Sequence, residues 1–272
     1  MPLVAVQGLT KSYALAGKRE RSTVVDHVSF QIERGQTLGL IGESGSGKST
    51  VARMLLRLIE PDAGEIIFDG ADLQAASHRQ MQQLRRRMQI VFQDPYAALN
   101  PRMRVERIVG EPLAIHAAEE IEQRTRASRR ERVSAMLRAV GMDDSALSRY
   151  PHEFSGGQRQ RINIARALIL QPELVVLDEP VSALDVSVAA QIVTLLQTLQ
   201  REFHLTYLFI THSMPLVRYL ADEIVVLRRG CVVEQGGWQQ ICEQPQSTYT
   251  QALLAATPEM PISQDQEPRP LQ

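Results

Sequence analysis

The feature that most constrains this chain is the glycine-rich run Gly42-Glu43-Ser44-Gly45-Ser46-Gly47-Lys48-Ser49-Thr50. It follows the apolar stretch 38–41, which reads as a buried strand. Apolar residues after it recur at helical spacing, namely Val51, Met54, Leu55, Leu58 and Ile59. A strand, a glycine-rich turn and a helix in this order are the setting that a phosphate-binding loop requires.

The residue types of this run suit phosphate chemistry. Gly42, Gly45 and Gly47 let the backbone curl so that successive N–H groups point at phosphate oxygens. Lys48 can reach the β- and γ-phosphates, and the Ser49 hydroxyl can ligate Mg²⁺. An ordinary glycine-rich turn is the alternative, which the full spacing disfavours. The sequence therefore predicts a nucleoside triphosphate site at residues 42–50, with Lys48 also acting in catalysis.

Composition excludes several classes of protein. The 272 residues carry 30 Lys and Arg against 31 Asp and Glu, so no generally basic surface for nucleic acid or membrane is expected. Two cysteines, Cys231 and Cys242, are too few for a disulfide framework. No apolar run approaches the roughly 18 residues of a membrane span. Any action at a membrane is therefore expected to need a partner.

The distribution of apolar residues predicts an α/β fold. Alternating residues before 33 indicate strands of a small antiparallel sheet, and continuous apolar runs at 174–177, 207–210 and 224–227 indicate a parallel sheet covered by helices. The stretch 96–171 reads as mainly helical. We expect an ATP-binding core at 1–95 and 172–236, with an N-terminal antiparallel β-subdomain. A helical subdomain at 96–171 and a tail at 237–272, disordered in its last part, complete the expected organisation.

Two adjacent acids, Asp178 and Glu179, end the apolar run 174–177. Ligands of open α/β sheets bind beyond the strand ends, and neighbouring residues of a strand point in different directions. Asp178 is accordingly expected to hold the Mg²⁺ hydration shell, and Glu179 to orient and deprotonate the attacking water. An ordinary acidic strand end is the competing interpretation.

A second anion site is predicted at Ser155-Gly156-Gly157-Gln158, which precedes another helical pattern. With the Arg-Gln-Arg at 159–161, this run closely resembles the signature of ABC-type ATPases. The order of motifs also resembles that family: phosphate loop, Gln93 after a strand, signature, Asp-Glu pair, Asp185 and then His212. The resemblance extends to about residue 255.

The resemblance implies a P-loop NTPase core with a RecA-like parallel sheet, an antiparallel β-subdomain and an inserted helical subdomain. Tyr13 matches the aromatic residue that stacks on adenine, although from the residues alone it could equally pack in the sheet. Gln93 matches the residue that senses Mg²⁺ and the γ-phosphate, and His212 the histidine that contacts the γ-phosphate. Residues 155–158, which include Gln158, match the segment that caps ATP held by the opposite subunit, and Asp185 matches the loop that communicates across that interface.

Further details resemble the oligopeptide/dipeptide/nickel importer branch: residues 42–45, 91–95, 99–101 and 249–254. Within that branch, the short tail resembles the second, shorter ATPase of the pair. The branch implies ATP and Mg²⁺ as cofactors and a peripheral position at the cytoplasmic face of the inner membrane. It implies three kinds of partner: a second homologous ATPase (a different chain or a second copy), two transmembrane permeases and, indirectly, an extracytoplasmic binding protein. No nucleic acid is expected.

This sequence departs from the branch at three places. Phe154 stands for the commoner leucine, Ser213 for the usual aspartate after the histidine, and Ser247-Thr248 where His-Pro is frequent. The short tail is as similar to the ATPase of nickel or metallophore importers as to that of peptide importers. The competing class is a soluble ABC ATPase acting on ribosomes or DNA, which usually carries two motif sets or a long coiled-coil insertion.

Overall fold

The computed structural model describes residues 1–14, 20–116 and 126–256 of the 272-residue chain. The described residues form two compact units. The first combines those of Met1–Gln83 and Thr206–Gln272, and the second is Leu84–Leu205. The subdomain boundaries expected from the sequence, which fall at residues 95, 171 and 236, stay a prediction.

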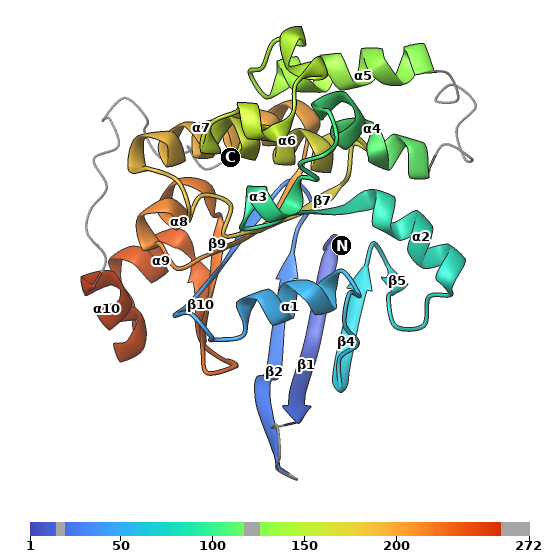
Figure 1. The fold of residues 1–272 in the computed structure, drawn as a ribbon. Helices are drawn as coiled ribbons and strands as arrows, with labels where there is room; N and C mark the ends of the chain where they lie inside the picture. Colours follow the sequence, from blue (N-terminus) through green and yellow to red (C-terminus); the bar gives the residue numbers. More distant parts are fainter. Residues whose placement is uncertain (15–19, 117–125, 257–272) are drawn as a thin grey trace. The chain divides into compact units, whose positions relative to one another are not determined.

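In the first unit, four strands form an antiparallel sheet in the order β2-β1-β4-β5 (Figure 1). Alternate residues of the two long strands are buried, which confirms the expected strand pattern near the N-terminus. Strand β2 begins at Arg21, and residues 15–19 lie outside the described part. The strands are β1 (Val4–Ala14), β2 (Arg21–Ile32), β4 (Ala63–Phe68) and β5 (Ala71–Asp72).

The first unit also contains the strand that leads into the phosphate loop, β3 (Thr37–Ile41). It lies between β8 (Thr206–Thr211) and β9 (Glu223–Arg228), and both pairings are parallel. Every residue of β3 and β8 is buried, as expected for strands covered on both faces. At the edge, β10 (Cys231–Gly237) pairs antiparallel with β9. The helices of this unit that follow β8 are α8 (Met214–Leu220), α9 (Trp238–Glu243) and α10 (Thr248–Ala255).

The helix after the phosphate loop, α1 (Lys48–Leu55), is shorter than its apolar spacing predicts. Arg57 adopts a left-handed conformation with φ 48°, and the N–H of Leu58 bonds to the carbonyl of Arg53. This is a Schellman ending, in which glycine usually occupies the left-handed position. Leu58 is consequently 51% exposed rather than part of the buried helix face.

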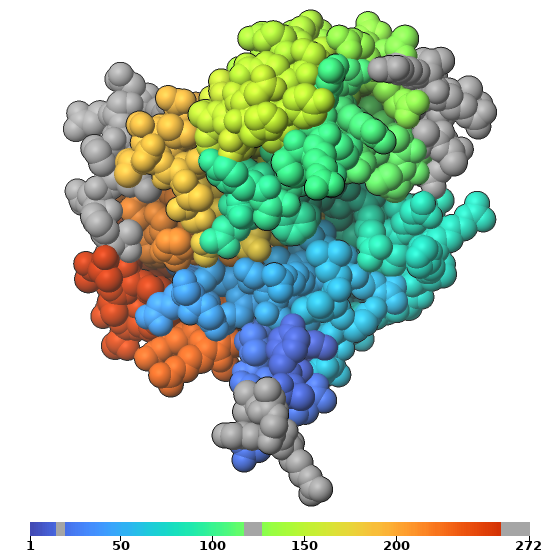
Figure 2. Space-filling view, in the orientation of Figure 1, coloured from blue at the N-terminus to red at the C-terminus, as the bar shows by residue number. Residues whose placement is uncertain are grey.

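The second unit is mainly helical around the parallel pair β6 (Met88–Val91) and β7 (Leu174–Asp178). Its central helix α6 contacts α3, α4, α5, α7 and β6. Figure 2 shows α3 and α4, drawn in green, at the molecular surface. The helices are α3 (Pro95–Ala98), α4 (Val105–Ile115), α5 (Arg126–Ala139), α6 (Gly156–Leu168) and α7 (Val186–Phe203), preceded by α2 (His78–Arg87). Residues 117–125 of the stretch expected to be mainly helical, and the last part of the tail, which is expected to be disordered, lie outside the described residues.

The fold class predicted from the sequence is confirmed: an α/β chain with parallel strands, an antiparallel sheet and a helical subdomain. Within residues 1–14, 20–116 and 126–256, no helix has both the length and the apolar character needed to span a bilayer.

Candidate nucleotide-binding site

The glycines of the phosphate loop are required by packing as well as by backbone conformation. Gly42 has φ 151°, and a Cβ placed on it would lie 2.1 Å from the carbonyl oxygen of Leu227. Gly47 has φ 108°, and its Cβ would lie 2.6 Å from the carbonyl oxygen of Val24. Both glycines therefore face backbone atoms of neighbouring strands, and any side chain at either position would push the loop out of place.

The loop is held by hydrogen bonds of its own backbone and of the β9–β10 turn. The Gly230 N–H donates to the Ser46 carbonyl at 2.9 Å, and the Ser46 N–H donates to the Glu43 carbonyl at 3.1 Å. Lys48 is only 5% exposed, and its Nζ donates to the carbonyls of Gly42 at 2.7 Å and Glu43 at 2.8 Å. The loop thus fixes the ammonium group at the first residue of α1.

The N-terminus of α1 has no side-chain cap. Its N-cap residue is Gly47, which offers no side-chain oxygen to the N–H groups of the first turn. These N–H groups and the positive end of the helix dipole are the elements that bind phosphate in such loops. The residues at 42–50 therefore fit the triphosphate that the sequence predicts.

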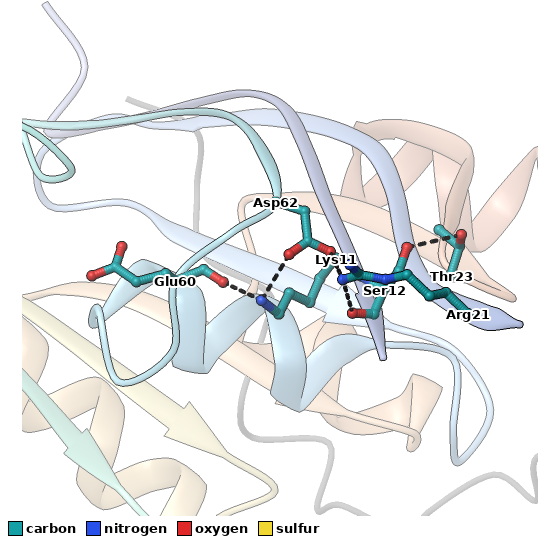
Figure 3. Close-up of polar contacts among 6 residues, drawn as sticks. All are labelled: Lys11, Ser12, Arg21, Thr23, Glu60 and Asp62. Atoms are coloured by element: carbon teal, nitrogen blue, oxygen red, sulfur yellow. Dashed lines mark hydrogen bonds and ion pairs between the residues drawn. The ribbon is translucent and has the colours of Figure 1, made fainter. Parts of the chain in front are cut away.

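Tyr13, the predicted base-stacking residue, lies near the end of β1 and is 41% exposed. The carboxylate of Asp62 holds the neighbouring backbone: Oδ2 accepts from the Ser12 N–H at 2.8 Å, and Oδ1 accepts from Lys11 Nζ at 3.0 Å (Figure 3). Arg21 Nη2 bonds to Oδ2 of Asp62 and to the Ser12 carbonyl. The Ser12 bond, followed by that of Lys11, lowers the pKa of Asp62.

This arrangement leaves the Tyr13 ring available. Lys11 Nζ lies 5.8 Å from the ring centroid, within the range of a cation–π contact. The β1–β2 register also shifts between Lys11 and Ser12, where one extra residue of β2 is accommodated. Such an irregularity changes the direction in which the following side chains point, as bulges next to functional sites do.

His212 directly follows the end of β8 and is exposed. The turn after it is held by the Thr211 hydroxyl, which accepts from the Ser213 N–H at 3.0 Å. Ser213 is the N-cap of α8 but makes no side-chain capping bond. His212, Tyr13 and the phosphate loop all belong to the first unit.

The second unit brings Gln93 and Glu179 together, with Gln93 Nε2 donating to Glu179 Oε2 at 3.1 Å. Glu179 adopts a left-handed backbone with φ 46°, a conformation that costs free energy for a residue with a side chain and clusters at functional sites. Its carbonyl accepts from the N–H and the hydroxyl of Ser182. Asp178, the last residue of β7, is 9% exposed.

The signature segment forms the N-terminus of α6. Ser155 is the N-cap, and a capping box joins it to Gln158: the Gln158 side-chain oxygen accepts from the Ser155 N–H at 3.0 Å. A Cβ on Gly157 would lie 2.5 Å from the Val188 side chain, so α6 begins in close contact with the first turn of α7. Asp185 is the N-cap of that helix. The second unit therefore clusters the signature with Asp185.

Sequence reasoning missed two residues that contact this machinery. Asp62 belongs to none of the sequence motifs, and Tyr249 belongs only to the segment 249–254 that resembles the importer branch. No sequence signal marks the contacts of either residue with strand β1 or the phosphate loop, because both contacts join segments that are far apart along the chain.

These features define a P-loop nucleoside triphosphatase. The loop supplies a buried lysine at the start of a helix and glycines that face neighbouring backbone, and two adjacent acids stand at the end of a parallel strand. The sequence profile of the family described as ABC transporter matches residues 25–182. The chain belongs to the ABC transporter family.

Relatives and solved structures agree with this assignment. A putative peptide import ATP-binding protein, BOV_A0347 of Brucella ovis, is 49% identical over 94% of this chain and 79% of its own length. The oligopeptide transport ATP-binding protein OppF of Bacillus subtilis is 48% identical over 88% of this chain and 78% of its own length.

Among solved structures, a dimeric post-hydrolysis state of the ATP-binding cassette MJ0796, bound to ADP and Pi, has TM-score 0.77 and 28% identity, covering 86% of this chain and 98% of that one. The structure of cbiO1 from Clostridium perfringens, part of the ABC transporter complex cbiONQ, has TM-score 0.76 and 26% identity, covering 90% of this chain and 92% of that one. The predicted family, fold class and ATPase activity are confirmed, and this protein binds and hydrolyses ATP.

Proposed function

We propose that this chain is the ATP-hydrolysing subunit of an importer that takes up peptides. The observation that carries the proposal is its identity of 48–49% to proteins named for peptide or oligopeptide import, over 86–95% of the chain. The related substrates nickel and metal chelates have no comparable support among these relatives. A soluble ABC ATPase acting on ribosomes or DNA is not favoured.

The residues of the first unit bind the nucleotide in this proposal. Lys48 binds the β- and γ-phosphates, while residues 42–50 surround them with N–H groups. Tyr13 stacks on the adenine, and His212 contacts the γ-phosphate. The buried, carbonyl-bound ammonium of Lys48 supports its role, because its position is fixed before nucleotide arrives.

Glu179 of the second unit orients the attacking water and takes its proton, and Gln93 holds the Glu179 carboxylate. The 3.1 Å bond between them supports this pairing, since an amide donor orients a carboxylate without neutralising it. Glu179 also has a left-handed backbone, a conformation that clusters at functional sites, and this supports its role in catalysis.

Mg²⁺ would be held by Ser49 and Asp178, with Gln93 sensing its presence. Within the part of the chain that the structure describes, no three His, Cys, Asp or Glu side chains cluster to hold a metal. A hydroxyl and one carboxylate suit a Mg²⁺ ion that takes its other ligands from nucleotide phosphates and water. Bound there, the ion would neutralise charge on the phosphates.

Residues 155–157 and Asp185 contact the ATP held by a second ATPase subunit. That subunit is a different but homologous chain or a second copy, and closure of the pair around ATP drives transport. The N-terminus of α6, where Ser155 is exposed and Gly156 and Gly157 are partly exposed, lies next to the start of α7 and supports an anion site that a partner's nucleotide completes.

The segment from Asp94 to Arg104 contacts the permeases, two transmembrane subunits that this chain meets at the cytoplasmic face of the membrane. Phe92 and Tyr96, on either side of Gln93 and Asp94, are 42% and 62% exposed, and apolar side chains of this size at a surface suit a docking site. A binding protein outside the membrane delivers the peptide to the permeases.

The test is a purification of tagged Glu179→Gln protein from its native cells in mild detergent with ATP present. Loss of the general base should lower ATP turnover by about a hundredfold or more while ATP still binds, so that the closed assembly accumulates. Glu202→Gln is the matched control, because it makes the same change at an exposed position of α7 and should keep full turnover.

Recovery of two membrane permeases with a second ATPase is expected, and their binding protein can then be assayed with peptides, Ni²⁺ and metal chelates. Recovery of ribosomal or DNA-repair proteins without any membrane protein would overturn the transport proposal. Near-normal turnover in Glu179→Gln would remove Glu179 from the role of general base.

A further inference from the structure

The C-terminal helix α10 contacts the phosphate loop directly. The backbone N–H of Glu43, the second residue of the loop, donates to the hydroxyl oxygen of Tyr249 at 3.1 Å. The two residues are 206 positions apart, and Tyr249 is only 7% exposed. The bond is part-buried: its acceptor lies on a buried side chain, whereas Glu43 is exposed.

Strand β10 helps to position the start of helix α10, which carries Tyr249. The carboxylate of Glu234, in β10, accepts from the N–H groups of Gln246 at 2.7 Å and Ser247 at 3.2 Å. Ser247 is the N-cap of α10, and its hydroxyl accepts from the Tyr249 N–H at 3.2 Å. The Arg228 guanidinium lies 4.8 Å from the Tyr249 ring centroid. Tyr249 is therefore held by the hydrogen bond of its backbone N–H and by the contact of Arg228 with the face of its ring.

At the other end of the bond, Glu43 connects Tyr249 to Lys48. The Glu43 carbonyl is one of the two that accept from Lys48 Nζ, and it also accepts from the Ser46 N–H. The side chain of Glu43 is exposed, so this connection runs through its backbone. The Glu43 N–H also belongs to the same planar peptide unit as the Gly42 carbonyl, so a shift of this N–H would move the carbonyl that accepts from Lys48 Nζ at 2.7 Å.

We propose that Tyr249 is a positioning residue for nucleotide binding: its hydroxyl fixes the Gly42–Glu43 peptide unit and, through the Gly42 and Glu43 carbonyls, the ammonium of Lys48. The inference rests on the proposed phosphate-binding role of Lys48. Because coupling free energies are reciprocal, nucleotide in the loop stabilises α10 by the same factor by which Tyr249 strengthens nucleotide binding.

The experiment compares two hydroxyl deletions on neighbouring residues of α10. Tyr249→Phe keeps the ring and its contact with Arg228 but removes the acceptor of the Glu43 N–H. Thr250→Val is the matched control: Thr250 is fully buried, and its hydroxyl has no hydrogen-bond partner among the described residues. Removal of an unsatisfied buried hydroxyl is neutral or stabilising for the fold.

We expect Tyr249→Phe to weaken binding of ADP and of a non-hydrolysable ATP analogue by about two- to tenfold, the range of one hydrogen bond. KM for ATP should rise with little change in kcat, since the loop holds the phosphates before and during reaction. Thr250→Val should bind both nucleotides like the wild type. Equal affinities in the wild type and Tyr249→Phe would overturn the inference, whereas absence of ATP binding by the wild type would overturn the proposed function instead.

Hydrogen exchange provides a readout that does not depend on activity. In the wild type and in Thr250→Val, ADP should slow exchange of the amides of α10 more than of those of α9, and in Tyr249→Phe this extra protection should disappear. If Tyr249→Phe does not fold, the wild type still decides: exchange of α10 that ADP leaves unchanged would overturn the inference.

Discussion

The two ends of the predicted nucleotide site in the first unit are held by different kinds of interaction. The phosphate loop is fixed by backbone hydrogen bonds, by the buried Lys48 and by two glycines that face neighbouring carbonyls. The strand end that carries Tyr13 is fixed by ion pairs of Asp62 with Lys11 and Arg21, and the Asp62 and Arg21 side chains are 33% and 60% exposed.

The difference matters because salt screens the exposed ion pairs at the strand end more strongly than the backbone hydrogen bonds of the loop. Exposed ion pairs are weak and are screened by salt, whereas buried backbone bonds depend little on ionic strength or pH. The phosphate loop, or phosphate end, is therefore expected to provide most of the affinity for ATP at any salt concentration or pH. The strand end that carries Tyr13, or base end, is expected to provide a smaller share that varies with salt and pH.

The largest effect is expected from a lysine-to-alanine substitution at the phosphate end, compared with the same substitution at the base end. Lys48→Ala removes the buried cation from the phosphates and should lower ATP turnover by about a hundredfold or more. Lys11→Ala removes only one of the cations bound to Asp62 and should reduce ATP affinity by a small factor. Turnover assays and ATP titrations measure both, and similar losses in the two variants would contradict the comparison.

A glycine substitution tests the rigidity of the phosphate end. Gly42→Ala would place its Cβ 2.1 Å from the Leu227 carbonyl and should lower the free energy of unfolding by about 2–4 kcal/mol. Gly70→Ala is the control, because Gly70 also has a positive φ but open space around its Cβ position, and it should cost about 1–2 kcal/mol. Urea denaturation of both variants compares them, and equal losses would show that close packing of the loop is unimportant.

At the base end, Tyr13→Ala should weaken ATP binding by about 1–3 kcal/mol, the contribution of one stacked base. Binding of inorganic triphosphate, which has no base, should not change, and Tyr13→Phe should restore ATP affinity because the stacking ring is kept. Competition titrations with ATP and triphosphate measure the two affinities. An ATP affinity equal to that of the wild type would return Tyr13 to a role in sheet packing.

The smallest effect is expected from Asp62→Asn, which should reduce ATP affinity a few-fold and less so at high salt. The lowered pKa of Asp62 in the folded chain means that its stabilisation is fully present above the unfolded pKa and is lost as the pH falls through the folded pKa. The wild type should therefore be more stable than Asp62→Asn at pH 6, with the difference vanishing well below about pH 4. Urea denaturation across this pH range checks the sign, and a difference that grows on acidification would contradict it.

Sequence reasoning succeeded where a pattern is local. The phosphate loop, the strand before it and the Asp178-Glu179 pair are contiguous, so their residues indicate both structure and chemistry. It was wrong about the end of α1, because Arg57 rather than glycine adopts the left-handed conformation that terminates the helix. The contacts of Glu43 with Tyr249 and of Ser12 with Asp62 could not be predicted, because they depend on how distant segments pack.

The position of β3 has a consequence for how the protein is made. Thr37 pairs with Tyr207 in β8 and Leu38 with Glu223 in β9, so the strand that leads into the phosphate loop obtains both of its neighbours from the last third of the chain. Contacts between such distant segments form slowly, and synthesis proceeds from the N-terminus. A nascent chain that has exposed the whole phosphate loop on the ribosome still lacks the strands that flank β3. Its apolar strand β3 stays unpaired until residues beyond 223 emerge. We therefore expect chaperones to bind the chain during translation, and truncated chains to aggregate.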